Sequence, residues 1–364
     1  MTPDATPTEI WTASAGALHS IERTAERVEA AGWDGLAVVD SQNIAGDSYV
    51  ALTLAARATD RIGLGTAVTN PVTRHPAVTA AAISGVQVAS RGRATLGIGR
   101  GDSSLAHLGR APVSWRVLER YVDVLQRYLR KERVPFDALR FHGEAVPDVD
   151  ALRLANGPTS SRLHWLDPEI ARVPVEVAAT GPKVIGVAAR LADRVMFALG
   201  AEPERILWGV ETARRARQAA GLDPAGLSFG AYVNAVSHPD LRTARALVRG
   251  GLTTFARFSV MHGAPVGPAS EAQREVLTAL GERYDMTRHT RSDSPQAGVL
   301  TDAFVDRYAV VGDADRCAER LRELCALGLS RIVVVGPSAG SERAEAVRAQ
   351  QLFAEQVLPA VRAR

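Results

Sequence analysis

The chain has few cysteines, no long apolar run and no obvious targeting segment. Its two cysteines, Cys317 and Cys325, fall in one expected helix, about 12 Å apart along the axis, which is too far for a disulfide. Two unpaired thiols are typical of a reducing compartment. No apolar run approaches the roughly 18 residues of a membrane span, and the N-terminal residues lack the basic and apolar regions of a secretion signal. These absences predict a cytoplasmic protein with no membrane partner.

The chain also has no large excess of either charge, and several common catalytic motifs are absent. The 43 basic and 40 acidic residues leave a net charge of only +3, and no basic run is interleaved with aromatics, which argues against nucleic-acid binding. HxH, HExxH and CxxC are absent, which argues against a metal site, and so are GxxxxGK[ST] and GxGxxG. A small organic molecule is left as the expected partner.

Eight short apolar runs alternate with helical patterns along the 364 residues. Most runs are almost continuously apolar, as parallel strands covered on both faces are. The expected strands are 9–13, 35–40, 62–68, 94–99, 173–179, 194–199, 227–236 and 331–335.

Apolar stripes with a 3.6-residue period predict helices between these strands. They include Leu18 to Val28, Trp115 to Leu129 and Cys317 to Leu324. Pro76, Pro182 and Pro203 stand at expected helix starts, a favoured place for proline. Alternating strands and helices predict an α/β protein, a (β/α)8 TIM barrel forming a single domain over 1–364. A doubly wound open sheet has the same alternation and is the alternative.

Two long stretches, 133–173 and 254–303, interrupt the alternation. We expect insertions there, the second with one helical piece at 269–284. Long insertions in a compact barrel are often lids or binding walls, and a surface decoration or an oligomer contact is the alternative.

Unusual polar residues follow the second, third and fourth expected strands, whose carboxyl ends meet at one mouth of a barrel. Asp40 and Ser41 follow the second strand, and Asn70 precedes Pro71 after the third. Asp40 is either a ligand contact or a turn cap. His75, just before Pro76, is more typical of a helix start than of a base.

The fourth strand runs into GIGRGDSS, residues 97–104. Glycines here let the backbone approach a flat or charged ligand. Gly99 and Gly101 are therefore candidate ligand contacts, and Asp102 is the candidate catalytic carboxylate.

The fifth strand runs through Thr180 and Gly181 into Pro182 at a helix start, with Lys183 in the first turn. A helix N-terminus attracts anions, and a lysine there is unfavourable for the helix dipole unless an anion is bound. The pattern predicts a phosphate site, and a plain turn with a solvated lysine is the alternative.

Taken together, AGWDGLAVVDSQN (31–43), LGTAVTNPVTRHP (64–76), GRATLGIGRGDS (92–103), VEVAATGPKV (175–184) and the tail 304–338 resemble the luciferase-like monooxygenase superfamily. The likeness is to its deazaflavin branch, which includes methylenetetrahydromethanopterin reductase. The resemblance implies a ring system lying across the carboxyl ends of the barrel strands. It also implies coenzyme F420 as the cofactor, with FMN as the alternative, and a homodimer.

The resemblance further places a non-prolyl cis peptide at Ala67–Val68 behind the ring, the phosphate at the turn from Thr180 to Lys183, and Asp102 near the reacting carbon. The cofactor-binding residues it implies are Asp40, Ser41, Ala67, Val68, Asn70, Gly99, Gly101, Ala179, Thr180, Gly181, Pro182 and Lys183.

The resemblance implies hydride transfer between F420 and a small organic substrate. An FMN-dependent two-component monooxygenase using O2 is the first alternative, and a barrel that binds a flavin-like molecule without turnover is the second. Asp102 would donate a proton if an apolar mouth raised its pKa. Ser41 stands where the sugar-phosphate dehydrogenases of the superfamily carry a histidine, so that residue's acid–base role is not carried over.

Overall fold

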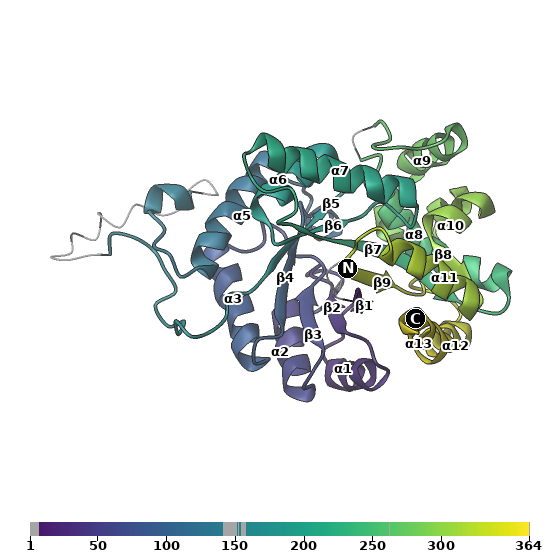
Figure 1. Cartoon of the computed structure of the whole chain (residues 1–364), viewed down its shortest axis with the longest axis horizontal. Helices are drawn as coiled ribbons and strands as arrows, with labels where there is room; N and C mark the ends of the chain where they lie inside the picture. Colours follow the sequence, from purple (N-terminus) through teal and green to yellow (C-terminus); the bar gives the residue numbers. More distant parts are fainter. Residues whose placement is uncertain (1–6, 141–150, 152, 154–157, 262, 364) are drawn as a thin grey trace, which may run out of the picture.

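A computed structural model describes residues 7–140, 151, 153, 158–261 and 263–363 of the chain. Eight parallel strands close into a barrel in the order β6-β5-β4-β3-β2-β1-β9-β7, and a β6–β7 pairing completes the ring. The predicted (β/α)8 barrel is confirmed, and the helices surround it (Figure 1). The barrel strands are β1 (Glu9–Ser14), β2 (Gly35–Val38), β3 (Gly63–Thr66), β4 (Ala94–Ile98), β5 (Val175–Ala179), β6 (Arg194–Phe197), β7 (Ser228–Ser237) and β9 (Arg331–Val335).

The helices begin where the sequence places their starts. Pro76, Pro182 and Pro203 each occupy the first turn of a helix, as predicted. Leu18 is an exception, because the first helix begins only at Ile21 and the Leu18 side chain is exposed. Among the described residues no helix is both long and apolar enough to span a membrane. The α-helices are α1 (Ile21–Ala30), α2 (Ser48–Ala58), α3 (Pro76–Ala89), α4 (Ser103–Ala106), α5 (Trp115–Leu129), α6 (Pro182–Leu191), α7 (Pro203–Ala219), α8 (Leu241–Phe258), α9 (Glu271–Arg283), α10 (Asp302–Tyr308), α11 (Ala314–Cys325), α12 (Arg343–Leu352) and α13 (Leu358–Arg362).

The second insertion differs from its predicted bounds. Residues 254–258 are the last turns of α8, so the insertion starts after Phe258 and carries α9 as expected. The apolar runs did not reveal one short strand, β8 (Val310–Gly312). It pairs with the carboxyl end of β7. Part of the first insertion, 133–173, lies outside the described residues.

The amino end of the barrel is filled by Trp11. Its indole lies so close to Gly35 and Gly63 that a Cβ on either glycine would come within 2.3 Å of a ring carbon. The Arg331 guanidinium stacks 3.8 Å from the indole and pairs with the buried Glu176. Because this end of the barrel is plugged, a ligand can reach the strands only from their carboxyl ends.

Candidate functional site

The end of β3 carries the most distinctive backbone feature of the barrel mouth. The peptide bond Ala67–Val68 is cis although Val68 is not proline, at the position that the resemblance implied. Thr69 N donates to Gly97 O at 3.0 Å, and Gly99 N donates to Thr69 O at 2.9 Å. The bulge that follows β3 is therefore hydrogen-bonded to the glycine-rich end of β4.

The glycines of β4 are needed for this close approach. A Cβ at Gly97 would lie 2.2 Å from the carbonyl oxygen of Thr66, and a Cβ at Gly99 would lie 3.0 Å from Val68 Cγ2. Backbone can pack this tightly only where a side chain is missing. Glycine at these positions therefore serves the β3–β4 contact, and the predicted contact of Gly99 with a cofactor stays a prediction.

Small apolar side chains form the floor of the mouth. Ala13, Ala67, Val68 and Ala178 pack onto the buried cluster around Trp11, yet each is only half buried. Four short side chains at this level leave room for a flat apolar group, and larger residues would fill it. The floor therefore fits the face of a tricyclic flavin or deazaflavin ring, which would lie on it within reach of Gly99.

Asp40 and its neighbours lie beside this floor, but their polar atoms are engaged within the protein. The buried Asp40 carboxylate accepts a hydrogen bond from Arg74 Nη1 at 2.8 Å, and Arg74 Nη2 donates to Asp47 at 2.8 Å. Ser41 Oγ lies 3.0 Å from Ser103 Oγ, across the loops after β2 and β4. Asp40 and Ser41 thus hold these loops in place, and their predicted contact with a cofactor stays a prediction.

The third-strand loop is built around Asn70. Its side-chain oxygen accepts from the N–H groups of Val72 and Thr73, and its Nδ2 donates to Thr73 Oγ1 at 3.1 Å and to Ser104 Oγ at 3.3 Å. His75 accepts from Ala77 N at the start of α3. His75 therefore caps a helix, as its sequence context indicated, and Asn70 organises the loop after β3, so its predicted contact with a cofactor stays a prediction.

Gly101 sets the position of Asp102. Gly101 has φ +79°, and a Cβ there would lie 2.7 Å from Leu105 Cδ1. Beyond this turn Asp102 Oδ2 lies 2.6 Å from Arg257 Nη1 of α8. A guanidinium therefore faces Asp102, whereas proton donation by Asp102 was expected only if an apolar mouth raised its pKa.

Sequence reasoning missed three residues that join Asp102 at the mouth, namely Arg257, Tyr284 and His289. The Arg257 guanidinium lies 4.5 Å from the centre of the Tyr284 ring. Tyr284 OH lies 2.7 Å from His289 Nδ1 and 3.2 Å from Thr254 Oγ1. These residues come from the end of α8 and from the second insertion, so the sequence signalled them only as part of the stretch 254–303 that interrupts the alternation.

Burial sets the protonation states of Tyr284 and His289. Desolvation raises the pKa of Tyr284 to about 12 and lowers the pKa of His289 to about 4. At neutral pH a protonated phenol therefore faces a neutral imidazole. The arrangement can hold one proton between two polar groups beside the Asp102–Arg257 ion pair.

The N-terminus of α6 opens at the same end of the barrel. Thr180 Oγ1 donates to Ala198 O at 3.3 Å, and Ala179 O accepts from Ala198 N at 3.0 Å, so β5 is fastened to the segment after β6. Gly181 is the N-cap residue, and no side chain in the described part of the chain caps the helix. Of the described atoms, only Val266 Cγ1 would lie within 4.0 Å of a Cβ on Gly181. Together with the exposed Lys183 side chain, this open end fits a phosphate.

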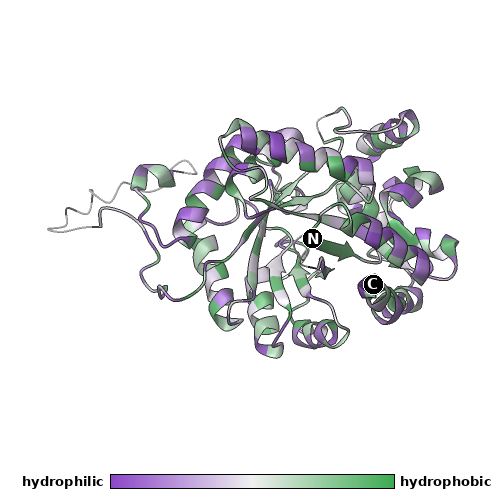
Figure 2. Ribbon diagram, in the orientation of Figure 1, coloured by the Kyte–Doolittle hydropathy of each residue, from purple (hydrophilic) through white to green (hydrophobic). Residues whose placement is uncertain are grey.

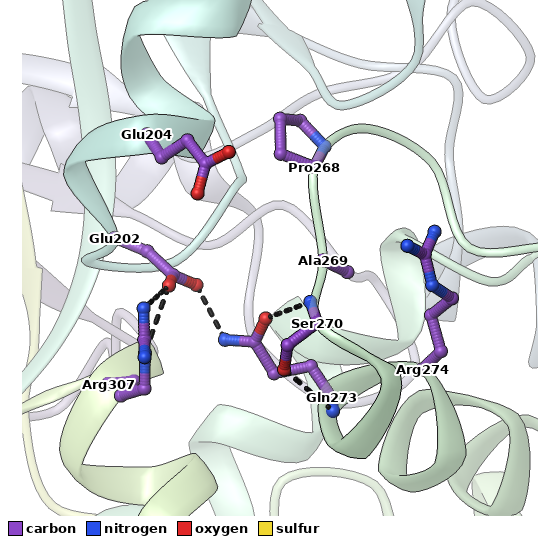
Figure 3. Close-up of a pocket in the computed structure, with 8 residues that line it drawn as sticks. All are labelled: Glu202, Glu204, Pro268, Ala269, Ser270, Gln273, Arg274 and Arg307. Atoms are coloured by element: carbon purple, nitrogen blue, oxygen red, sulfur yellow. Dashed lines mark hydrogen bonds and ion pairs between the residues drawn. The ribbon is translucent and has the colours of Figure 1, made fainter.

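A hollow of about 330 Å³ lies beside the loop between β6 and α7, where the second insertion meets it (Figure 3). Its buried acid, Glu202, accepts from Gln273 Nε2 at 2.7 Å and from Arg307 Nε at 3.0 Å. Gln273 also completes the capping box of α9 with Ser270. Glu202 therefore ties the insertion to the barrel, and its carboxylate is engaged within the protein.

Comparison with known proteins agrees with this geometry. Residues 4–331 match the family model described as luciferase-like monooxygenase. The 5,10-methylenetetrahydromethanopterin reductase of Methanolobus tindarius is 26% identical over 90% of this chain and 93% of its own length. The F420-dependent glucose-6-phosphate dehydrogenase of Beutenbergia cavernae is also 26% identical, over 92% of this chain and 91% of its own.

Solved structures share the fold. The coenzyme F420-dependent tetrahydromethanopterin reductase from Methanopyrus kandleri superposes with a TM-score of 0.69 at 21% identity, covering 97% of this chain and 99% of that one. The monooxygenase RslO1 from Streptomyces bottropensis has a TM-score of 0.63 at 19% identity, covering 97% and 99%. The match of the family model to most of the chain, on a barrel with this mouth, shows that the protein belongs to the luciferase-like monooxygenase family.

Proposed function

We propose that this protein is an F420-dependent oxidoreductase that transfers a hydride between the coenzyme and a small organic substrate. The observation that carries the proposal is the full-length similarity to F420-dependent reductases and dehydrogenases, combined with a small-residue floor at the carboxyl end of the barrel. The floor fits the ring of FMN as well as that of F420. Our preference for F420 therefore rests on the similarity to F420-dependent enzymes.

The coenzyme ring would be held by Ala67, Val68 and Gly99, and its phosphate by the α6 N-terminus with Lys183. When bound, the deazaflavin supplies a two-electron hydride donor or acceptor at its central ring. The protein supplies orientation and a mouth from which water is largely displaced.

The chain's own polar groups face the open side of that ring. In this proposal Asp102, whose Oδ2 accepts from Arg257 Nη1, orients a polar group of the substrate. Tyr284, which keeps its proton at neutral pH, is the group with a proton to share. This division of roles replaces the proton donation by Asp102 that the sequence suggested.

Binding of the two coenzymes tests the proposal. Purified protein is titrated with oxidised F420 and, separately, with FMN, and binding is followed by coenzyme fluorescence. We expect F420 to bind and reduced F420 to be reoxidised by an organic acceptor without O2. Tight FMN binding with O2 consumption would instead support the two-component monooxygenase, the alternative that the family description favours.

A homodimer formed through α3 is part of the proposal. Val78 and Val88 are about half exposed on its outer face, at 53% and 48%. Figure 2 shows α2 and α3 as paler and greener than α6 and α7. An apolar outer face on a surface helix is typical of an interface, and a second copy of the chain would cover it.

Gly85 provides the test of this interface. A Cβ there meets nothing within 4 Å, so Gly85→Arg can be accommodated by the monomer and should halve the mass measured by light scattering. Gly298→Arg, at an equally open position, is the control and should leave the mass unchanged. A cytoplasmic location remains proposed, on the two free thiols.

A further inference from the structure

The hydroxyl of Tyr284 lies at the edge of the floor of the mouth. Its oxygen is 3.2 Å from Thr254 Oγ1 of α8. The next residue of that helix, Phe255, packs onto the same buried cluster as Ala67 and Val68 of the floor. The last turns of α8 therefore bring this hydroxyl beside the floor, and the Tyr284 side chain is only half buried there.

His289 holds the same hydroxyl more closely. Its Nδ1 is 2.7 Å from Tyr284 OH, and the imidazole is also only half buried. An imidazole can release a proton from one ring nitrogen while it takes one up at the other. The two side chains therefore offer a proton a path from water to the phenol at the edge of the floor.

The charges around the two side chains allow the phenol to give up its proton during a reaction. The Arg257 guanidinium lies 4.5 Å from the centre of the Tyr284 ring and stabilises negative charge on it. Asp102, the partner of Arg257, opposes that charge, and His107 is a further titratable group that acts on His289. At neutral pH the phenol starts protonated and the imidazole neutral.

A proton source beside the floor is needed by only some hydride acceptors. When a hydride adds to the carbon of a carbonyl group, the oxygen becomes a strongly basic alkoxide, and a positioned acid speeds the reaction by protonating it. An iminium ion that accepts a hydride becomes a neutral amine and needs no proton. The phenol at the edge of the floor therefore favours a carbonyl acceptor.

We propose that the substrate pair is a carbonyl compound and its alcohol, with Tyr284 as the catalytic acid and His289 as the residue that positions it and restores its proton. This inference rests on the proposed function, because reduced F420 is the hydride donor. It adds the class of substrate and the origin of the proton.

The step balances in atoms and electrons. A C–H bond forms at the carbonyl carbon with the hydride pair of the reduced deazaflavin, which is thereby oxidised. The π pair of the C=O bond moves to oxygen, and this oxygen takes the proton as the Tyr284 O–H bond breaks. His289 then passes its Nδ1 proton to the phenolate and takes a proton from water at Nε2. Rotation or exchange with water returns the imidazole to its first tautomer.

The inference requires one tautomer of His289, which is measurable without coenzyme. Tyr284 can aim its proton at a substrate only if its oxygen accepts from Nδ1–H of His289; with the proton on Nε2, the phenol would donate to Nδ1 instead. Nitrogen NMR on protein with isotope-labelled histidine reads the tautomer, and His289→Gln assigns the signal. We expect Nδ1–H for His289, and Nε2–H for His75, whose Nδ1 accepts from Ala77 N at 3.2 Å.

Substitutions separate the two roles from a structural one. With reduced F420 and a set of ketones and aldehydes, Tyr284→Phe should lose about a hundredfold or more in kcat. Its KM and its Kd for F420 should stay near the wild-type values. His289→Gln keeps a donor for the phenol and should lose only about tenfold in kcat, whereas His289→Phe should lose as much as Tyr284→Phe.

Tyr128→Phe is the matched control. Tyr128 is a buried tyrosine of α5, outside the barrel, and its OH donates to Ser161 Oγ at 2.7 Å. This control loses a hydrogen bond as Tyr284→Phe does, so its stability should fall, and its kcat should stay at the wild-type value.

If the wild type binds F420 and no carbonyl compound reoxidises the reduced coenzyme, the inference is overturned, and the proposed function still stands with an iminium ion or another acceptor. A wild-type kcat in Tyr284→Phe, or a proton on Nε2 of His289, would overturn the inference too. Failure of the wild type to bind F420 would instead defeat the proposed function and the inference together.

Discussion

The ion pair between Asp102 and Arg257 can be tested by a double-mutant cycle. The pair joins the loop after β4 to α8 at 2.6 Å, with side chains 14% and 18% exposed. At an effective dielectric constant of about 20, two unit charges about 4 Å apart attract by about 4 kcal/mol. Desolvation of two mostly buried charges offsets much of this. We therefore expect a coupling free energy of about 1–2 kcal/mol.

The cycle compares Asp102→Asn, Arg257→Gln and the double variant by urea unfolding at one ionic strength. Each single variant leaves one mostly buried charge unpaired and should lose about 2–3 kcal/mol. The double variant should lose less than the sum. Loss of the contact between Arg257 and the Tyr284 ring occurs in both arms that remove the arginine, so it cancels in the coupling term.

A coupling below about 0.5 kcal/mol would refute the reasoning, since it would mean that water screens the pair. Arg245 and Asp306 provide the control, because they join the same helix α8 to α10 at 2.6 Å with similar exposure. Breaking that pair should leave F420 binding unchanged, whereas Asp102→Asn should alter the KM for the organic acceptor.

Four further predictions concern residues around the mouth. His289 has a folded pKa of about 4 against 6.5 when unfolded, so the unfolded state binds the extra proton between these values. Unfolding free energy should fall by about 2–3 kcal/mol as the pH drops from 7.5 to 4.5, and His289→Gln should flatten this slope in urea titrations. Lys183→Ala should raise the F420 Kd about tenfold and Lys183→Arg much less, because the positive charge remains; equal Kd values for all three proteins would exclude a phosphate at α6. Gly97→Ala should lose about 3 kcal/mol or more or fail to fold, since its Cβ would meet backbone at 2.2 Å. Gly99→Ala, with a methyl group of Val68 at 3.0 Å, should fold and bind F420 more weakly, and a normal Kd would contradict the assigned floor.

Much of the fold could be predicted because the signals are local. Continuous apolar runs marked the barrel strands, since parallel strands are covered on both faces. Proline at the first helical turn marked the starts of α3, α6 and α7. The strand β8 went unnoticed because three residues carry too little periodicity to separate them from a helix end.

The site was predicted unevenly. Residues next to strand ends, such as Asp102, could be placed at the mouth because all strand ends of a barrel meet there. Arg257 and Tyr284 could not. Arg257 and Tyr284 approach Asp102 only through long-range packing of α8 and the second insertion.

By itself the sequence determined the alternation of strands and helices, the family resemblance and the positions of the glycines after β4, because periodicity and backbone freedom act between near neighbours. Tertiary structure alone decided that Asp102 faces a guanidinium and that His289 is kept neutral by burial. Each of these depends on which distant side chains are brought within a few ångströms, and electrostatics and desolvation respond to that distance rather than to sequence separation.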